Sequence, residues 1–367
     1  MKRRALAGLV VVCTLAAGAF AGRALVSRAD AQAKSGPGSV PPAQKEVVFY
    51  GFGGTHEKNM RARIIPAFEQ KYGVKVVYVT GTANSSFAKV RAQKDRPEGD
   101  VLWTNDVLHV VGKRLGLFEK LDPQRLTNLN DVLDIAKDSE GIGAMQGFQA
   151  EGLQYNTKVF RDKGWPVPTS WYDLWKPEFK GRVGLYGASG AYMQYFIPFL
   201  ARLEGGNERN VEAAFKKLKD LAPSAPTFVN APAELDNLIK QGEVWITFNG
   251  SSRVYELAGT GFPVDFVYPK EGTILFGNWF EVLKGAPHPE LAQEFVNYLV
   301  SAEAQAAFAK YVFFGPINRL TKLDPETAKR VPHTREQLAK LVKLDYVAMN
   351  EQLPAWTDRF NKEIERR

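Results

Sequence analysis

The residues best suited to chemistry in this chain are polar loop residues that follow apolar stretches. Loops at residues 53–55, 81–85 and 104–106 each follow a predicted strand and carry glycine, hydroxyl or amide groups. Glycine lets backbone N–H groups approach a small molecule, and polar side chains fix its orientation. The first loop matches neither glycine pattern of nucleotide-binding proteins, so a solute contact and an ordinary tight turn remain as interpretations. The contact candidates are Gly54, Thr55, Asn84 and Asn105.

A second group of polar residues lies between residues 151 and 253. The segment Gly187–Gly190 reads Gly-Ala-Ser-Gly, and its hydroxyl and N–H groups suit a carboxylate or a phosphate. Arg253 is either a solvated residue or a guanidinium that holds an oxyanion through two hydrogen bonds. Glu151 is contrary evidence, because a carboxylate would suit an ammonium group. The contact candidates in this group are Glu151, Tyr155, Ser189, Asn249 and Arg253.

The strongest single contact candidate is the segment Phe276-Gly277-Asn278-Trp279. Tryptophan is usually a core residue. Here it neighbours glycine and Asn278, a mixture that suits a wall which stacks on a solute and fixes it with one polar group. We therefore add Asn278 and Trp279 to the contact candidates.

Catalysis has little support in this sequence. The four histidines, His56, His109, His288 and His333, form no His-Glu-x-x-His pair. Ser189 has no obvious paired base, and no Gly-x-Ser-x-Gly elbow occurs. We expect no catalytic residue, no metal site and no cofactor. The rival hypothesis is a hydrolase or transferase that uses the same polar residues to line its cleft.

Apolar runs and glycine-rich turns alternate with helical periodicity, which predicts α/β units with parallel strands. The first half contains predicted strands at 47–50, 74–79 and 101–103, with helices at 57–72 and 87–93. A second unit has strands at 152–156, 183–186 and 244–248, with helices at 192–203, 210–221 and 233–241. Further on, a strand at 274–283 precedes a helix, and Ser301 is a predicted N-cap of a second helix, 302–310.

The order of parts from residue 273 to 318 resembles the solute-binding proteins of bacterial ABC importers, in the group that takes polyamines, iron and related solutes. An aromatic strand, a helix pair and a turn that contains glycine, proline and asparagine follow one another in that family. The matching residues are Pro289, Ala292, Phe295, Asn297, Gly315, Pro316 and Asn318.

The resemblance implies an α/β, two-lobed periplasmic-binding-protein fold, type II-like. Each lobe would be a mainly parallel sheet covered by helices, with the ligand in the interlobe cleft. It places residues 45–148 plus 254–313 in the first lobe and 149–253 plus 314–367 in the second. Residues 264–267 and 274–283 would belong to the first sheet, and the chain would cross between lobes near 147–152 and 248–253.

The family pattern also bears on the solute. Polyamine binders carry an aromatic residue and an aspartate where this chain has Phe276 and Asn278, and the missing carboxylate argues against a polyamine. The iron-binding branch uses clustered tyrosines, whereas this chain has Phe313 and Phe314 beside Tyr311. The amide-rich loops and Arg253 favour a small organic anion or zwitterion; a polyamine or ferric iron is the alternative.

The N-terminus resembles an export signal, with a basic head, an apolar run and an Ala-x-Ala site that ends at Ala33. A competing site ends at Ala21, and an uncleaved anchor or lipidation at Cys13 are alternatives. Residues 1–33 carry five basic residues and one acidic residue, a charge of +4, so +4 of the total +8 would remain. That balance is weak evidence for nucleic acid.

These features predict residues 1–33 as a signal peptide and 34–44 as a flexible tether. The resemblance implies a periplasmic receptor whose partners are a small-molecule solute and the permease subunits of an ABC importer, which a separate ATPase drives. We expect a monomer that does not bind nucleic acid.

Overall fold

The structure is a computed structural model, and it describes residues 45–365. The predicted signal peptide, the tether and Cys13 therefore lie outside the described residues. The strands are β1 (Glu46–Phe52), β2 (Lys75–Gly81), β3 (Val101–Asn105), β4 (Ala144–Asn156), β5 (Val183–Tyr186), β6 (Phe228–Val229), β7 (Ile246–Gly250), β8 (Val264–Val267), β9 (Thr273–Val282) and β10 (Leu341–Val342).

These strands form one connected network in the order β2-β1-β3-β9-β4-β7-β5-β6, with β10 on β9 and β8 on β4. Pairing is parallel for β1 with β2 and β3, and for β5 with β6 and β7. The pairs that involve β4, and the pair of β3 with β9, are antiparallel. The sheets are therefore mixed: parallel pairs occur among the outer strands and between β10 and β9, while the pairs of β4 and the pair of β3 with β9 are antiparallel.

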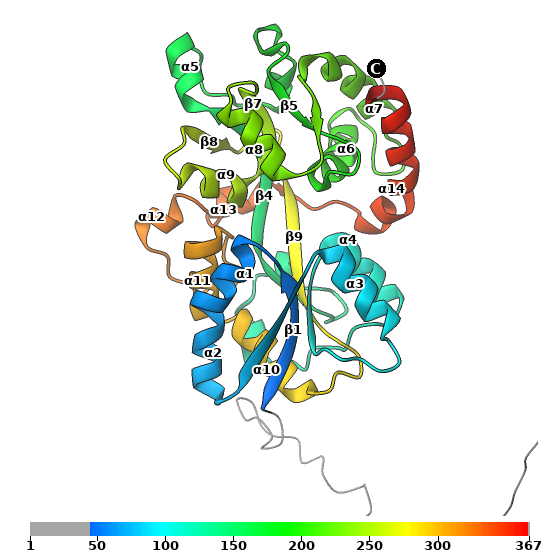
Figure 1. Cartoon of the computed structure of the whole chain (residues 1–367), viewed down its shortest axis with the longest axis vertical. Helices are drawn as coiled ribbons and strands as arrows, with labels where there is room; N and C mark the ends of the chain where they lie inside the picture. Colours follow the sequence, from blue (N-terminus) through cyan, green and yellow to red (C-terminus); the bar gives the residue numbers. More distant parts are fainter. Residues whose placement is uncertain (1–44, 366–367) are drawn as a thin grey trace, which may run out of the picture. The chain divides into compact units, whose positions relative to one another are not determined.

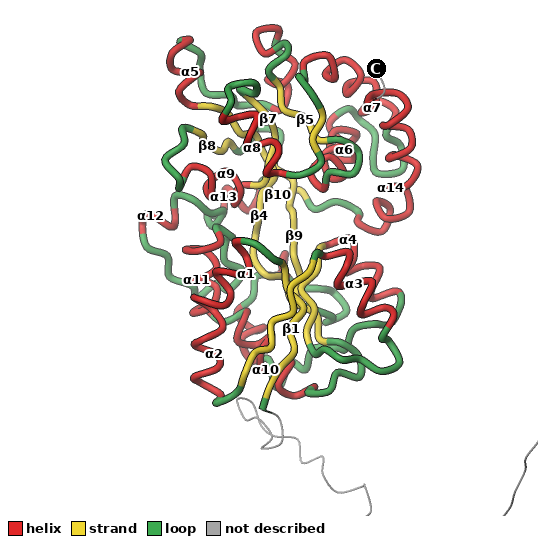
Figure 2. The backbone as a smooth tube through the Cα atoms, viewed as in Figure 1, coloured by secondary structure: helices red, strands yellow, loops and turns green. Residues whose placement is uncertain are grey.

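Two long strands, β4 and β9, run through the middle of the fold and pair with each other (Figure 2). The first part of β4 and the last part of β9 lie with β1, β2 and β3, which we call the first lobe. The other ends lie with β5, β6, β7 and β8, which we call the second lobe. β4 thus runs from one lobe to the other.

The return crossing differs from the prediction. β8 pairs with Leu153–Asn156 of β4, in the second lobe, and not with the first sheet as expected. The helix Ser251–Ala258 that follows β7 packs against β8, so residues 248–253 do not leave the second lobe. The chain returns to the first lobe through β9. Thr273 and Ile274, at the start of β9, pair with β10, and residues 278–282, at its end, pair with β3 of the first lobe.

Helices cover the sheets and bury their apolar faces against them (Figure 1). They are α1 (Thr55–Asn59), α2 (Ile65–Tyr72), α3 (Ala83–Ala92), α4 (Asp106–Arg114), α5 (Thr157–Lys163), α6 (Ala191–Leu203), α7 (Glu212–Leu221), α8 (Pro232–Lys240), α9 (Ser251–Ala258), α10 (Pro289–Leu299), α11 (Ala302–Val312), α12 (Pro325–Ala328), α13 (Arg335–Ala339) and α14 (Tyr346–Phe360). A π-helical turn, Met60–Ile64, joins α1 to α2, so the predicted first helix is one helical run.

The C-terminal helix α14 contacts both lobes, whereas the sequence placed the tail on the second lobe alone. Glu351 accepts from Arg114 of α4 at 3.2 Å and from Arg209 at 3.1 Å. Residues near Gly315 also stay with the first part of β4, since Gly315 and Phe148 exchange backbone hydrogen bonds of 2.7 Å. The tail therefore begins beside the first lobe and ends beside α7 in the second.

The predicted N-cap role of Ser301 is confirmed, because its hydroxyl accepts a hydrogen bond from the Ala304 N–H at 3.2 Å. The contribution of this cap to stability can be measured. Ser301→Ala removes that acceptor and should lower the free energy of unfolding by about 1 kcal/mol in urea titrations. Ser301→Asp keeps an acceptor and is the control. Equal losses in both variants would contradict the cap.

Candidate functional site

A cleft with a volume of about 990 Å³ lies between the two lobes. The first lobe contributes the loops after β1, β2 and β3, which end at the same edge of its sheet. The second lobe contributes the start of α6, the start of α8 and the start of α9. The lining residues are Phe52, Gly53, Gly54, His56, Thr80, Gly81, Thr82, Ala83, Ser85, Asn105, Gln149, Ser189, Ala191, Tyr192, Asn230, Ala231, Pro232, Ala233, Ser252, Arg253, Phe276 and Asn278.

Five of the eleven contact candidates line this cleft, and they come from both lobes: Gly54, Asn105, Ser189, Arg253 and Asn278. Their convergence follows from the strand order, since β1, β2 and β3 deliver three loops to one edge and β9 brings Asn278 beside Asn105. Ser189 Oγ donates to Asn230 Oδ1 at 2.6 Å, which joins two lining segments of the second lobe.

Two further candidates flank the cleft without lining it. Thr55 begins α1 and Asn84 lies in the first turn of α3, and both side chains are exposed. Their neighbours Gly54 and Ser85 line the cleft instead. In a helical turn adjacent side chains point about 100° apart, so one residue can face the cleft while the next faces solvent.

Three candidates lie inside the second lobe. Tyr155 packs edge-to-face on Phe160 with ring centroids 4.9 Å apart, and Asn249 accepts from Tyr186 and donates to Gln154 at 2.9 Å. Glu151 is completely buried in β4, and both of its carboxylate oxygens lack a hydrogen-bond partner. Burial alone raises the pKa of Glu151 well above its usual range and thereby favours the neutral carboxyl.

Trp279 is a correction to the sequence analysis, because it does not line the cleft. Its exposed fraction is 2%, its Nε1 donates to Asp106 Oδ1 at 2.8 Å, and its ring stacks on His109 at 4.1 Å. Side chains alternate across a strand, so Phe276 and Asn278 face the cleft while Gly277 and Trp279 face the other side of β9. Core packing, the ordinary role of tryptophan, is what the structure shows.

Asp106 lies beneath the cleft and joins the lobes. Its oxygens accept the hydrogen bond from Trp279 Nε1 described above. They also accept hydrogen bonds from the Gly277 N–H at 2.6 Å and from the Tyr195 hydroxyl of α6 at 3.4 Å. Burial raises the pKa of Asp106 to about 6, although the hydrogen bonds from Trp279 and Gly277 oppose this shift. Because three donors already engage the carboxyl, Asp106 is a structural link and not a solute contact.

Arg253 fits neither sequence interpretation fully, because it is part-buried and already paired. Its Nη1 donates to Glu256 at 2.6 Å and its Nη2 to Asp236 at 3.4 Å, while 27% of the side chain is exposed. Its Nε is buried and has no hydrogen-bond partner. The two carboxylates thus orient the guanidinium and leave Nε as its nitrogen without a partner.

The sequence analysis missed several lining residues, above all His56, Gln149, Tyr192 and Phe276. Gln149 Nε2 donates to Ser252 Oγ at 2.6 Å, and Phe276 packs on Tyr192 with centroids 5.4 Å apart. Strand alternation was the available signal for Gln149, which lies two residues before Glu151. Tyr192 is 94% covered, and it is nevertheless one of the residues that line the cleft.

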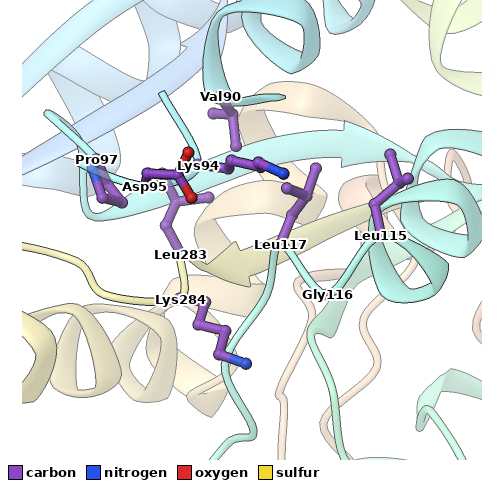
Figure 3. Close-up of a pocket in the computed structure, with 9 residues that line it drawn as sticks. All are labelled: Val90, Lys94, Asp95, Pro97, Leu115, Gly116, Leu117, Leu283 and Lys284. Carbon is purple, nitrogen blue, oxygen red and sulfur yellow. The ribbon is translucent and has the colours of Figure 1, made fainter. Parts of the chain in front are cut away.

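A second pocket, of about 220 Å³, lies on the first lobe (Figure 3). Val90, Leu117 and Leu283 provide apolar walls, and Lys94 extends between Val90 and Leu117. The polar residues that line it, such as Lys94 and Lys284, are exposed surface side chains. The interlobe cleft, with its convergent polar groups from both lobes, is therefore the candidate site.

Two further features concern the described residues, 45–365: possible metal ligands and possible membrane-spanning helices. No group of three or more histidine, cysteine, aspartate or glutamate side chains in this range is arranged to hold a metal ion. Within the same range, no helix has the length and apolar character required to cross a membrane.

Two lobes joined by long central strands around a polar cleft define a periplasmic-binding-protein fold. A family profile described as bacterial extracellular solute-binding protein matches residues 63–334, most of the described chain. The chain belongs to this family, whose members bind solutes for ABC transporters and are not enzymes.

The relatives of this chain bind different solutes. It is 29% identical over 279 residues to the spermidine/putrescine-binding periplasmic protein of Escherichia coli K12, covering 72% of this chain and 77% of that one. It is 27% identical over 297 residues to the gamma-aminobutyric acid-binding protein of Pseudomonas aeruginosa, covering 76% and 79%. A solved extracellular solute-binding protein of Bordetella parapertussis superposes with a TM-score of 0.77 at 24% identity, covering 88% and 99%.

Glu151 generates a prediction about stability and pH. The pKa of Glu151 is higher in the folded state than in the unfolded state, where it is near 4.5. The contribution of Glu151 to the free energy of unfolding is therefore fully present below pH 4.5 and is lost as the pH rises toward the folded-state pKa. Glu151→Gln cannot ionise, so its gain in unfolding free energy should be larger at pH 8 than at pH 5 by more than about 1.4 kcal/mol. Urea unfolding at both pH values measures this difference. Glu243→Gln, at an exposed carboxylate, is the control, and identical pH profiles for both variants would refute the buried neutral carboxyl.

Proposed function

We propose that the protein is an exported receptor that captures one small organic anion or zwitterion in the interlobe cleft and delivers it to the permease of an ABC importer. The observation that carries this proposal is the charge of the cleft wall. Among its described lining residues Arg253 is the formally charged side chain, and none is a carboxylate. Glycine, amide and hydroxyl groups provide the remaining polar contacts.

The type of solute follows from this wall. An acidic group is attracted by Arg253 and by backbone N–H groups of the loops, whereas a polycation would meet no lining carboxylate. A zwitterion would bring its acidic group to Arg253, which Glu256 and Asp236 orient through their ion pairs. The gamma-aminobutyric acid-binding relative takes such a zwitterion, which supports the proposal.

The alternatives within the family have weaker support. A polyamine is favoured by the spermidine/putrescine-binding relatives and by the two carboxylates beside Arg253. Ferric iron needs several anionic oxygen donors, and Tyr192 is the tyrosine among the lining residues. We also propose export through the N-terminal signal, a monomer in solution, and the two lobes as closing units.

Capture and release would follow the lobe arrangement. A solute that touches both walls of the cleft stabilises the closed form through contacts that the open form lacks. Gly54 and Asn105 would contribute from the first lobe, and Ser189 and Arg253 from the second. A permease would then recognise the closed receptor, and a separate ATPase would drive transport.

Native mass spectrometry of the purified protein tests the proposal. We expect one small organic solute bound per chain and released unchanged on denaturation, with thermal stabilisation by the same compound. A screen of carboxylates, amino acids, phosphonates, polyamines and ferric chelates supplies the comparison. Stabilisation by spermidine or putrescine alone would contradict the anion or zwitterion, and chemical turnover of the solute would contradict the receptor.

The two aromatic residues of β9 provide a matched pair of variants. Phe276→Ala should weaken solute binding at least tenfold, about 1.4 kcal/mol, because it removes an apolar surface from the cleft floor. Trp279→Ala should instead lower the free energy of unfolding by about 3–5 kcal/mol, because it leaves a core cavity. Calorimetric binding and urea unfolding measure the two effects, and a reversed pattern would restore Trp279 as the solute contact.

A further inference from the structure

Two nitrogen atoms, one on each wall of the cleft, are buried and have no hydrogen-bond partner. They are Nδ1 of His56, in α1 of the first lobe, and Nε of Arg253, in α9 of the second. Both residues line the same cleft. An unpaired buried polar atom costs about 1–3 kcal/mol, so two of them on facing walls indicate that something else completes the site.

His56 is held rigidly by its aromatic neighbours. Its ring packs against Trp103 with centroids 5.5 Å apart, and against Phe52 and Phe314 at 6.1 Å. Burial lowers the pKa of His56 to about 4; Glu256 opposes this shift and Arg253 adds to it. These two residues of α9 are the charged groups that face the imidazole, which is therefore neutral at pH 7.

Arg253 is held as firmly from behind. Glu256 and Asp236 engage its two terminal nitrogens, as described above, and fix the plane of the guanidinium. A planar guanidinium carries five N–H donors in a fixed arrangement, so the direction of Nε–H is set once the other two nitrogens are paired. Nε is the nitrogen that these two carboxylates leave unpaired, and it belongs to a residue that lines the cleft.

We infer that His56 and Arg253 together bind one oxyanion of the solute, a carboxylate or phosphate oxygen, and that a proton from solvent joins His56 as the anion binds. The inference rests on the proposed function and assigns its acidic group to two named residues. With both ring nitrogens protonated, His56 donates to the oxygen from one wall while Arg253 donates from the other. The oxyanion would thereby connect the two lobes.

The sign of the pH dependence follows from linkage. Without solute, His56 is neutral above about pH 4. A bound oxyanion favours the imidazolium and raises the pKa of His56, so binding takes up a proton between pH 4 and the raised value. Affinity for an oxyanion should therefore increase as the pH falls from 8 toward 5. A solute without an acidic group would show no such increase.

Isothermal titration calorimetry of the full mature chain tests this inference with three probes. 4-Aminobutyrate and inorganic phosphate carry an oxyanion, whereas putrescine has the chain length of 4-aminobutyrate with a second amine in place of the carboxylate. Titrations at pH 6 in two buffers with different ionisation heats report the protons taken up. We expect uptake approaching one proton with an oxyanion probe, and affinity about tenfold higher at pH 5.5 than at pH 7.5.

Three variants separate this role from a structural one. His56→Gln retains polar atoms and cannot titrate, so it should abolish proton uptake and flatten the pH profile. Arg253→Lys keeps the charge and loses the planar donor, so affinity for oxyanion probes should fall about tenfold. His333→Gln, whose Nδ1 contacts the Val331 carbonyl outside the cleft, should leave both readouts unchanged.

The outcomes distinguish the proposed oxyanion site at His56 and Arg253 from the proposed receptor function of the whole protein. Wild-type uptake of protons that persists in His56→Gln would overturn the inference, as would oxyanion binding with no uptake. Failure of both oxyanion probes to bind would also overturn it, while native mass spectrometry judges independently whether the protein captures a solute. Uptake lost in His56→Gln and kept in His333→Gln supports it.

Discussion

The antiparallel pairing of β4 with β9 is the interaction on which the fold depends. Each strand belongs to both lobes, and the pair extends from Ala144 opposite Phe280 to Glu151 opposite Ile274, with a register shift near residue 147. Every other strand attaches to one end of this pair or the other. The pair therefore fixes which loops face each other across the cleft. The C-terminal segment and buried contacts such as that of Tyr195 with Asp106 also join the lobes.

Buried polar groups reinforce this centre. Asp106 receives donors from β9 and from α6, so one carboxyl contacts both lobes. On the far side of Trp279, His109 lies between Glu281 at 2.5 Å and Asp138 at 3.2 Å. Burial opposes protonation, but these two carboxylates raise the pKa of His109 to about 9. His109 thus has two buried carboxylate partners in the first lobe, whereas both carboxyl oxygens of Glu151 in the second lobe lack a hydrogen-bond partner.

The cleft combines two kinds of polar group with different consequences. Satisfied groups such as Ser189 with Asn230 and Gln149 with Ser252 give the wall a fixed shape before any solute arrives. Unsatisfied atoms on His56 and Arg253 keep hydrogen-bonding capacity unused. A receptor requires both, because a rigid wall limits the entropy lost on binding and unused donors supply the difference in energy between closed and open forms.

The sequence by itself predicted many of the strands and helices in their order, the N-cap at Ser301 and the three polar loops of the first lobe, because periodicity and caps depend on near neighbours in the chain. It did not predict α4, α9, β6 or β10. The tertiary structure alone decided that β8 joins the second lobe, that β9 is the return crossing, and that Phe276 faces the cleft instead of Trp279. The reason is physical: the face that a strand residue occupies is set by partners such as Asp106, 173 residues away from Trp279 in the chain. The same holds for His56 and Arg253, whose roles emerge only when distant helices bring their unpaired nitrogens to one cleft.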